Sequence, residues 1–176
     1  DWGPTARNIA QAIATQVGGG IGGAIFNTFF PAKGFNWGTL TTLLESAIKS
    51  GLDAQTLSDE TSKLNDAIPF LHIAYADYKA KNPSDYKNLT AKLQIPYTQI
   101  DSVVSRLMQP DVANTGLPSF MISASTQLAI LQEMALVDIN SPNEPLNSSH
   151  IADIKAYAKI FIPFATNTFQ SIRDIR

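Results

Sequence analysis

The sequence of 176 residues has no cysteine, two histidines and few charged residues. Without cysteine it has no disulfide scaffold, no thiol nucleophile and no cysteine-ligated zinc or iron–sulfur site. Charged residues make up 16% of the chain, whereas they make up ~25% of an average soluble domain. The net charge is −2, so no basic field attracts nucleic acid, and we expect no nucleic-acid partner.

The sequence also lacks a long uninterrupted hydrophobic run. Its longest nearly uncharged stretch, residues 107–132, is broken by Pro110, Gly116 and several polar residues, so we do not expect a constitutive membrane span. No basic segment precedes an apolar one near the beginning, and no signal peptide is visible. Apolar residues still amount to 44% of the chain, which predicts a globular domain with a substantial core.

Apolar residues recur with the helical period nearly throughout, and no alternating run is bounded by hairpin turns. We therefore predict an all-α fold: a bundle of six to seven helices around a central apolar helix, in one domain spanning residues 1–176. The predicted helices cover residues 5–17, 24–30, 37–50, 53–81, 84–108, 118–138 and about 149–173. Pro69 predicts a kink in the fourth of them, and Pro96 predicts a break in the fifth.

Residues 118–138 form the most informative predicted helix. Its 21 residues would span about 31 Å at 1.5 Å per residue. Only Glu133 and Asp138 are charged, and small polar residues follow one narrow face. A helix that is apolar on most sides belongs in the middle of a bundle or in a membrane, so we expect it to be the most buried helix. The apolar positions expected to be inaccessible are Ile122, Leu128, Ile130 and Leu131.

Five glycines in six residues separate the first two predicted helices. They are Gly18, Gly19, Gly20, Gly22 and Gly23. A phosphate-binding loop needs a preceding strand and a Gly-Lys-Ser/Thr ending, and a helix precedes this run, so we do not expect nucleotide binding. We interpret the run as a flexible hinge that leaves residues 5–17 loosely attached. The alternative is a membrane-active hinge, because its glycines have small-xxx-small spacing beside aromatic residues.

No spacing predicts a catalytic set or a cofactor site, and we do not expect an enzyme. His150 and Asp153 are two ligands where zinc usually takes three or four, so we interpret them as a solvated helix start and expect no metal. His72 is interpreted as a histidine at the edge of the core. Glu133 needs attention, because a carboxylate in an apolar helix must find a partner, take up a proton or face water. Its alternative interpretation is a helix-end residue near the surface.

The sequence suggests two kinds of covalent processing, glycosylation and proteolytic cleavage. Asn88 and Asn147 begin N-glycosylation sequons, which matter only in a eukaryotic secretory context. The chain begins at Asp1 and ends at Arg176, which a trypsin-like protease would leave. We expect a proteolytic product or an excised piece of a longer chain, in which case β-rich sequence would follow residue 176.

The order of these features resembles the N-terminal domain of the three-domain crystal insecticidal toxins, the delta-endotoxins. Residues 22–31 (Gly-Gly-Ala-Ile-Phe-Asn-Thr-Phe-Phe-Pro), then Trp37 and Glu45, are similar to the split second helix of that family. Leu117-Pro118 and the run to Asp138 resemble its central fifth helix. Residues 153–173, with Tyr157, Asn167 and Phe169, are similar to its sixth helix. The family usually has a histidine in the central helix, where this chain has Gln127 or a neighbour.

The resemblance implies a pore-forming domain that stays soluble until a hairpin of residues 84–108 and 118–138 inserts into a membrane. The hydrocarbon core is ~30 Å thick, about the length of the central helix. The residues expected to face lipid are Leu89, Leu93, Tyr97, Ile100, Val104, Leu107, Phe120, Ile122, Leu128, Ile130, Leu131 and Leu136. The residues expected to line the pore are Lys92, Gln99, Asp101, Arg106 and Glu133.

The resemblance also implies partners and a place of action. The partners are the lipid of a target cell membrane, further copies of the chain in a pore, and a receptor contacted through domains absent from this sequence. The protein would be secreted, released or stored in an intracellular crystal inclusion, and would act at the target membrane. The competing interpretation is a soluble helical interaction module without membrane activity. The helical period of the apolar residues does not distinguish a pore-forming domain from an interaction module, because a soluble pore-former also buries its apolar faces in a core.

Overall fold

The computed structural model describes residues 55–175, and this part of the chain is all-α. Its elements are α4 (Gln55–Pro69), η1 (Phe70–Tyr75, π-helical), α5 (Ala76–Lys81), α6 (Tyr86–Leu107), α7 (Ala113–Leu136), η2 (Pro145–Asn147, a 3₁₀ turn) and α8 (Ser149–Ile175). The first three predicted helices lie outside the described residues. So does the predicted hinge of Gly18, Gly19, Gly20, Gly22 and Gly23. The described part holds five α-helices and no strand, which confirms the helical class.

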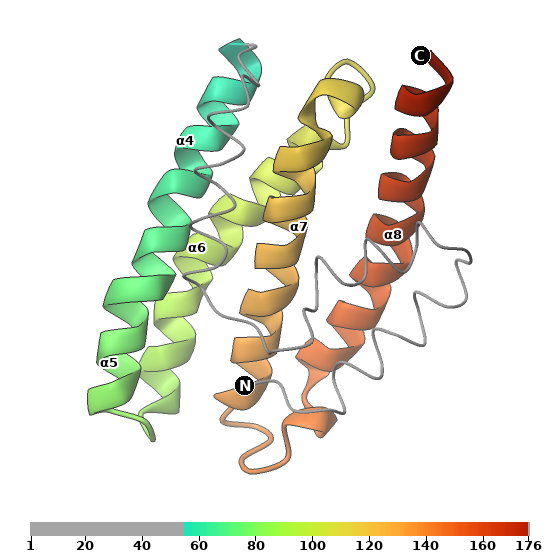
Figure 1. Cartoon of the computed structure of the whole chain (residues 1–176). Coiled ribbons are helices and arrows are strands. Elements are labelled where there is room, and N and C mark those ends of the chain that lie inside the picture. The colour runs from blue at the N-terminus through green and yellow to red at the C-terminus, as the bar shows by residue number, and fades with distance from the viewer. Residues whose placement is uncertain (1–54, 176) are drawn as a thin grey trace.

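One helical rod runs from α4 through η1 to α5 (Figure 1). Leu64, Ile68, Leu71 and Tyr75 bury its inner side. At Pro69, where a kink was predicted, the structure places the start of a π-helical segment. The chain stays helical on both sides of the proline, and the wider turns follow it directly.

The bounds of α6 and α8 agree with the sequence pattern, but two other details do not. The predicted break at Pro96 is wrong, because α6 is continuous through it. Pro96 is itself buried, between the buried Leu93 and Ile100, so packing on both sides holds the helix together. The predicted start of the most apolar helix at Pro118 is also wrong, since α7 begins at Ala113.

Helix α7 packs against α6 on one side and α8 on the other, and it also contacts α4 (Figure 1). It is the most buried of the helices within residues 55–175, as predicted. Leu128, Ile130 and Leu131 are inaccessible, whereas the side chain of Ile122 lies outside what the structure describes. The ring of Phe120 meets Phe161 and Phe164 of α8 edge-on, with centroids 5.7 and 4.6 Å apart. Each such pair adds about 0.5–1.5 kcal/mol to the burial of the rings.

Candidate functional site

The candidate site is α7 itself, because its buried surface contains many polar side chains. Gln127 and Gln132 are fully buried, and so are several hydroxyl-bearing residues: Ser119, Ser123, Ser125 and Thr126. Burying such groups costs free energy unless they find hydrogen-bond partners. The Ser123 hydroxyl donates to the Phe120 carbonyl of the preceding turn at 2.9 Å, which is the usual way for a helical serine to be satisfied. An ionised glutamate has no hydrogen to donate to such a carbonyl, so Glu133 needs donors from outside its own helix.

Glu133 has two partners on the rod beside it. The Tyr75 hydroxyl donates to Glu133 Oε1 at 2.8 Å, and the Lys79 ammonium forms an ion pair with the same oxygen. Tyr75 and Lys79 are four residues apart, so they lie on the same face of the rod. The Glu133 side chain is 13% exposed and that of Lys79 is 36% exposed. A carboxylate in this helix had to find a partner, take up a proton or face water, and Glu133 has found partners. We call these three residues the Glu133 cluster.

The Glu133 cluster changes the acidity of its tyrosine. Tyr75 is only 1% exposed. Burial raises the pKa of its hydroxyl well above the ordinary 10.0, and the nearby Glu133 carboxylate raises it further. Both effects act against the tyrosinate, since a second negative charge would stand beside Glu133 in a poorly solvated place. Tyr75 therefore remains a hydrogen-bond donor to Glu133 throughout the neutral pH range.

A second polar cluster lies where α6, α7 and α8 meet. The Gln127 amide nitrogen donates to Asp101 Oδ1 at 2.8 Å. Burial raises the pKa of Tyr97, and a hydrogen bond with Tyr157 of α8 raises it further. A hydrogen bond with Gln127 lowers the same pKa by a smaller amount. The amide oxygen of Gln127 has no partner among the described residues. This Gln127 cluster therefore holds polar groups of three helices together but leaves one acceptor unsatisfied.

Asp138 forms a third set of polar contacts, between the end of α7 and the start of α8. The Ser148 hydroxyl donates to Asp138 Oδ2 at 2.6 Å, and the Asn140 N–H donates to Oδ1 at 2.9 Å. The bond from Ser148 is the main reason that the pKa of Asp138 is lowered. Ser148 also accepts a hydrogen bond from the His150 N–H at 3.2 Å. The carboxylate therefore fixes the residue that caps α8.

The predicted pore-lining residues are in different surroundings. Lys92 and Gln99 are half-buried on α6. Arg106 forms a two-pronged ion pair with Asp111, at 3.0 and 2.9 Å. Asp101 points instead into the Gln127 cluster, because it lies nine residues, or about two and a half helical turns, after Lys92 and therefore on the opposite face of α6.

The predicted lipid-facing residues form part of the core. Those that are buried are Leu89, Leu93, Ile100, Val104, Leu107, Phe120, Leu128, Ile130 and Leu131. Tyr97 and Leu136 are half-buried. The hairpin of α6 and α7 therefore keeps these side chains in or beside the core, whereas Ile95 of α6 is exposed.

The other residues singled out in the sequence are exposed, except His150, which is half-buried. His72 is exposed, so its predicted place at the edge of the core is wrong: it follows buried Leu71, and one helical step turns it away from the core. His150 Nδ1 lies 3.9 Å from Asp153. Within residues 55–175 no group of three or more His, Asp or Glu side chains is placed to hold a metal ion. Asn88 and Asn147 of the two sequons are exposed.

The comparisons with known proteins add no relative. No family model, curated protein or solved structure matches the chain. Among the described helices, none combines the length and the hydropathy that a membrane crossing needs.

Sequence reasoning singled out Glu133 but missed its partners. Tyr75 and Lys79 are 58 and 54 residues away from it in the chain. The available signal was their spacing of four residues, which places a hydroxyl and a cation on one helical face. Gln127 was noticed only as a departure from the resembled family, and its bond to Asp101 had no sequence signal.

Proposed function

We propose that this chain is a membrane-permeabilising toxin domain of the delta-endotoxin kind, and that the hairpin of α6 and α7 enters the target membrane. The observation that best supports the proposal is the composition of α7. Its 24 residues span about 36 Å, enough for the ~30 Å hydrocarbon core. Yet the helix buries two glutamines and several hydroxyls inside the fold and leaves its one carboxylate only 13% exposed. A helix selected only as a core would gain stability from apolar residues at those positions.

The contacts of α7 fall into two groups under this proposal. The bond from Gln127 to Asp101 lies within the hairpin and can persist when the hairpin moves as a unit. The Glu133 cluster, the Phe120 ring pairs and the Asp138–Ser148 bond join α7 to other elements and must break. The Glu133 cluster is the strongest polar contact of the second group. It is therefore the main latch that keeps α7 in the folded state.

The inserted state needs several copies of the chain. The polar side chains of α7 and the charges of α6 cannot face lipid, since each would be poorly solvated there. Around a pore they face water or each other, while the leucines and isoleucines face lipid. The proposed pore-lining set remains Lys92, Gln99, Asp101, Arg106 and Glu133.

The rest of the proposal follows the resembled family. The full domain is a bundle of six to seven helices around α7, with the glycine hinge between its first helices. It has no enzymatic activity, and its partners are membrane lipid, further copies of itself and a receptor reached through additional domains. The protein is secreted, released or stored in crystals before it acts at the target membrane.

The competing proposal is a helical interaction module, and the surface does not favour it. Within residues 55–175, the large apolar side chains that are exposed lie on five different segments: Ile73, Ile95, Ile139, Leu146 and Ile160. Single exposed residues of this kind are normal for a soluble protein, whereas an interaction site presents a contiguous apolar patch.

A tether across the Glu133 cluster tests the proposal. The chain has no cysteine, so the double variant Lys79→Cys, Glu133→Cys can be linked specifically with a short bifunctional thiol reagent. The matched control is Asp77→Cys, Lys81→Cys, whose exposed side chains also form an ion pair but within α5 alone. The measurement is dye release from liposomes, with linkage verified by intact mass.

The proposal expects the parent chain, the unlinked variants and the linked control to release dye, and the linked Lys79–Glu133 variant to release little. Dye release by the linked variant at the rate of its unlinked form would contradict insertion of α7. A parent chain that releases no dye from neutral or anionic liposomes would favour the interaction module.

A further inference from the structure

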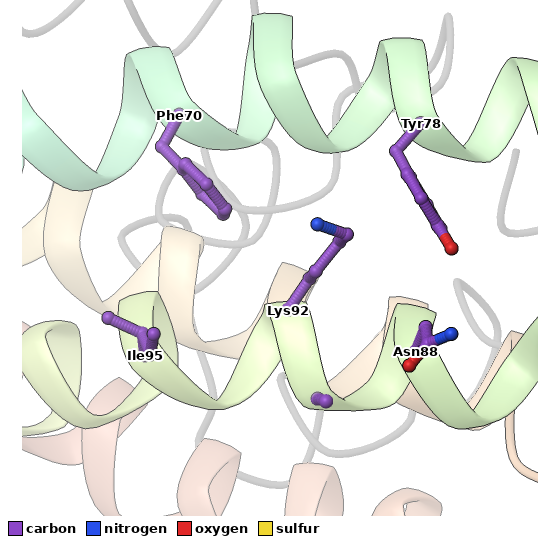
Figure 2. A pocket seen from close by; sticks show the side chains of 6 residues that line it. Phe70, Tyr78, Asn88, Lys92 and Ile95 are labelled. Atoms are coloured by element: carbon purple, nitrogen blue, oxygen red, sulfur yellow. The ribbon is translucent and has the colours of Figure 1, made fainter.

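A groove opens between α6 and the η1–α5 part of the helical rod (Figure 2). Its volume is about 440 Å³, which is within the range of small-molecule sites. The lining residues are Phe70, Tyr78, Asn88, Ala91, Lys92 and Ile95. Figure 2 shows the rings of Phe70 and Tyr78 extending from the rod toward α6, with the Lys92 side chain rising between them. The groove therefore combines two aromatic rings with one ammonium group.

Among the described residues that line the groove, Lys92 is the only one with an ionic side chain. Its Nζ lies 4.4 Å from the centroid of the Tyr78 ring, which is a cation–π contact. Among residues 55–175 it has no carboxylate within ion-pair distance. The ring holds the ammonium in place without neutralising its charge or accepting conventional hydrogen bonds. The site is thus able to receive an anion.

The polar groups at one end of the groove are already occupied. The Tyr78 hydroxyl donates to Asp85 Oδ2 at 2.5 Å, and the Asn88 amide donates to the same oxygen at 2.9 Å. These two donors are consequently not free for an incoming anion, and Asp85 repels anions at that end. An anion must bind Lys92 from the side of Phe70 and Ile95.

The wall on that side is apolar. Phe70, Ala91 and Ile95 form it, and Ile95 is 68% exposed. A free inorganic anion would contact the ammonium but leave this wall in water. A neutral apolar molecule would cover the wall but remove water from an unpaired ammonium, which costs free energy. A molecule with an anionic group joined to an apolar chain satisfies both parts of the groove.

We propose that this groove binds an anionic lipid, with the headgroup phosphate on Lys92 and the adjoining acyl segment along Phe70 and Ile95. The choice of a lipid among anionic amphiphiles rests on the proposed membrane function. The site lies on the outer side of the α6–rod interface and is formed in the folded state. Lys92 therefore acts before insertion, by selecting membranes with an anionic surface.

Monomeric lipids test the inference without any pore. The full chain, labelled with ¹⁵N, is titrated with dihexanoyl phosphatidylglycerol below its micelle concentration, and backbone shifts of residues 88–95 are followed. Parallel titrations use dihexanoyl phosphatidylcholine and inorganic phosphate. We expect the anionic lipid to shift these resonances with saturation, and the other two probes to bind at least about tenfold more weakly, the size of one charge-assisted contact.

Three variants locate the site. Lys92→Gln removes the charge and should weaken binding of the anionic lipid about tenfold. Ala91→Trp fills the groove and should abolish binding while the charge remains. Lys87→Gln is the matched control, since Lys87 is an exposed lysine on the same helix outside the lining, and it should bind like the parent. Circular dichroism verifies that each variant is folded.

Several outcomes would overturn the inference. Equal affinity for the two lipids would remove the role of the charge, and equal affinity for inorganic phosphate would remove the role of the apolar wall. Equal losses in Lys87→Gln and Lys92→Gln would mean diffuse attraction to a basic surface. A parent that releases liposome dye but binds no monomeric lipid contradicts the groove alone. A parent that binds the lipid but releases no dye contradicts the proposed pore alone.

Discussion

Glu133 and its neighbour Gln132 carry polar groups into the fold in two different ways. Glu133 has a hydroxyl and an ammonium as partners, both supplied by the rod of η1 and α5. Gln132 is 1% exposed, and neither atom of its amide has a partner among the described residues. One residue therefore ties α7 to its surroundings, whereas the other carries the cost of a dehydrated amide.

Under the proposed function, this difference bears on how easily α7 leaves the fold. Partnered groups such as Glu133 set the barrier to leaving the fold, because their partners remain behind. Unpartnered groups such as Gln132 lower that barrier, because water outside the fold solvates them better than the core does. Under the proposed function, we expect the balance between the two kinds of residue to set how readily α7 leaves the fold.

The largest effect is expected from removing the cation of the Glu133 cluster. Lys79→Met leaves the carboxylate with only Tyr75, and the loss of stability should be about 2 kcal/mol, below the 3–5 of a fully buried pair because Lys79 is partly exposed. Chemical denaturation measures it. Lys79→Met with Glu133→Gln should recover most of the loss, since no charge is then left unpaired. If the double variant is as unstable as the single one, the ion pair is not the latch.

Replacing the unpartnered amide should have the opposite sign. Gln132→Met keeps the volume but removes the buried polar group, and should stabilise the fold by about 1–2 kcal/mol. It should also slow dye release. Gln127→Met is the matched control, because it breaks a bond to Asp101 and should destabilise. A Gln132→Met variant less stable than the parent would show that the amide has a partner outside residues 55–175.

Removing the hydroxyl of the cluster is a smaller perturbation with a clear pH signature. Tyr75→Phe should cost about 1 kcal/mol at neutral pH. Because burial and Glu133 raise the pKa of Tyr75 in the folded state, its unfolded form ionises first, and stability is lost as pH rises above 10. Denaturation midpoints of the parent should therefore fall more steeply than those of Tyr75→Phe between pH 9 and 11. Parallel curves would contradict the buried donor.

The sequence predicts much of this fold where a clear apolar stripe ends at a strong boundary. Asn82-Pro83-Ser84 before α6 and Ser148-Ser149 before α8 are such boundaries, and both helices were predicted within about two residues. Prolines misled the prediction twice. Pro96 lies within a continuous helix, and α7 begins before Pro118, because packing of neighbouring residues outweighs the local preference.

The candidate site was less predictable, for a different physical reason. Glu133 was recognisable because a lone carboxylate in an apolar helix must be satisfied somewhere. Its partners come from a different helix, more than fifty residues earlier, and a single sequence holds no signal for which helices will face each other. The groove at Lys92 depends on the same unpredicted pairing of the rod with α6.

The smallest expected effect is at the end of α7, where Asp138 tests whether partnered groups outside the Glu133 cluster also matter. Asp138→Asn should cost about 1 kcal/mol at pH 7, because it weakens the acceptor for the Ser148 hydroxyl that caps α8. The bond from Ser148 lowers the pKa of Asp138 below its ordinary 3.8, so this stability is present above about pH 4 and is lost as pH falls further. The difference between parent and variant, measured by urea denaturation, should therefore shrink from pH 7 to pH 3. A difference that stays constant would mean that the charge contributes nothing. Dye release at pH 7 should rise above that of the parent in both Lys79→Met and Asp138→Asn, but only slightly in Asp138→Asn, because the Glu133 cluster still holds α7. Equal release by the two variants would make the Asp138 contact an equal latch.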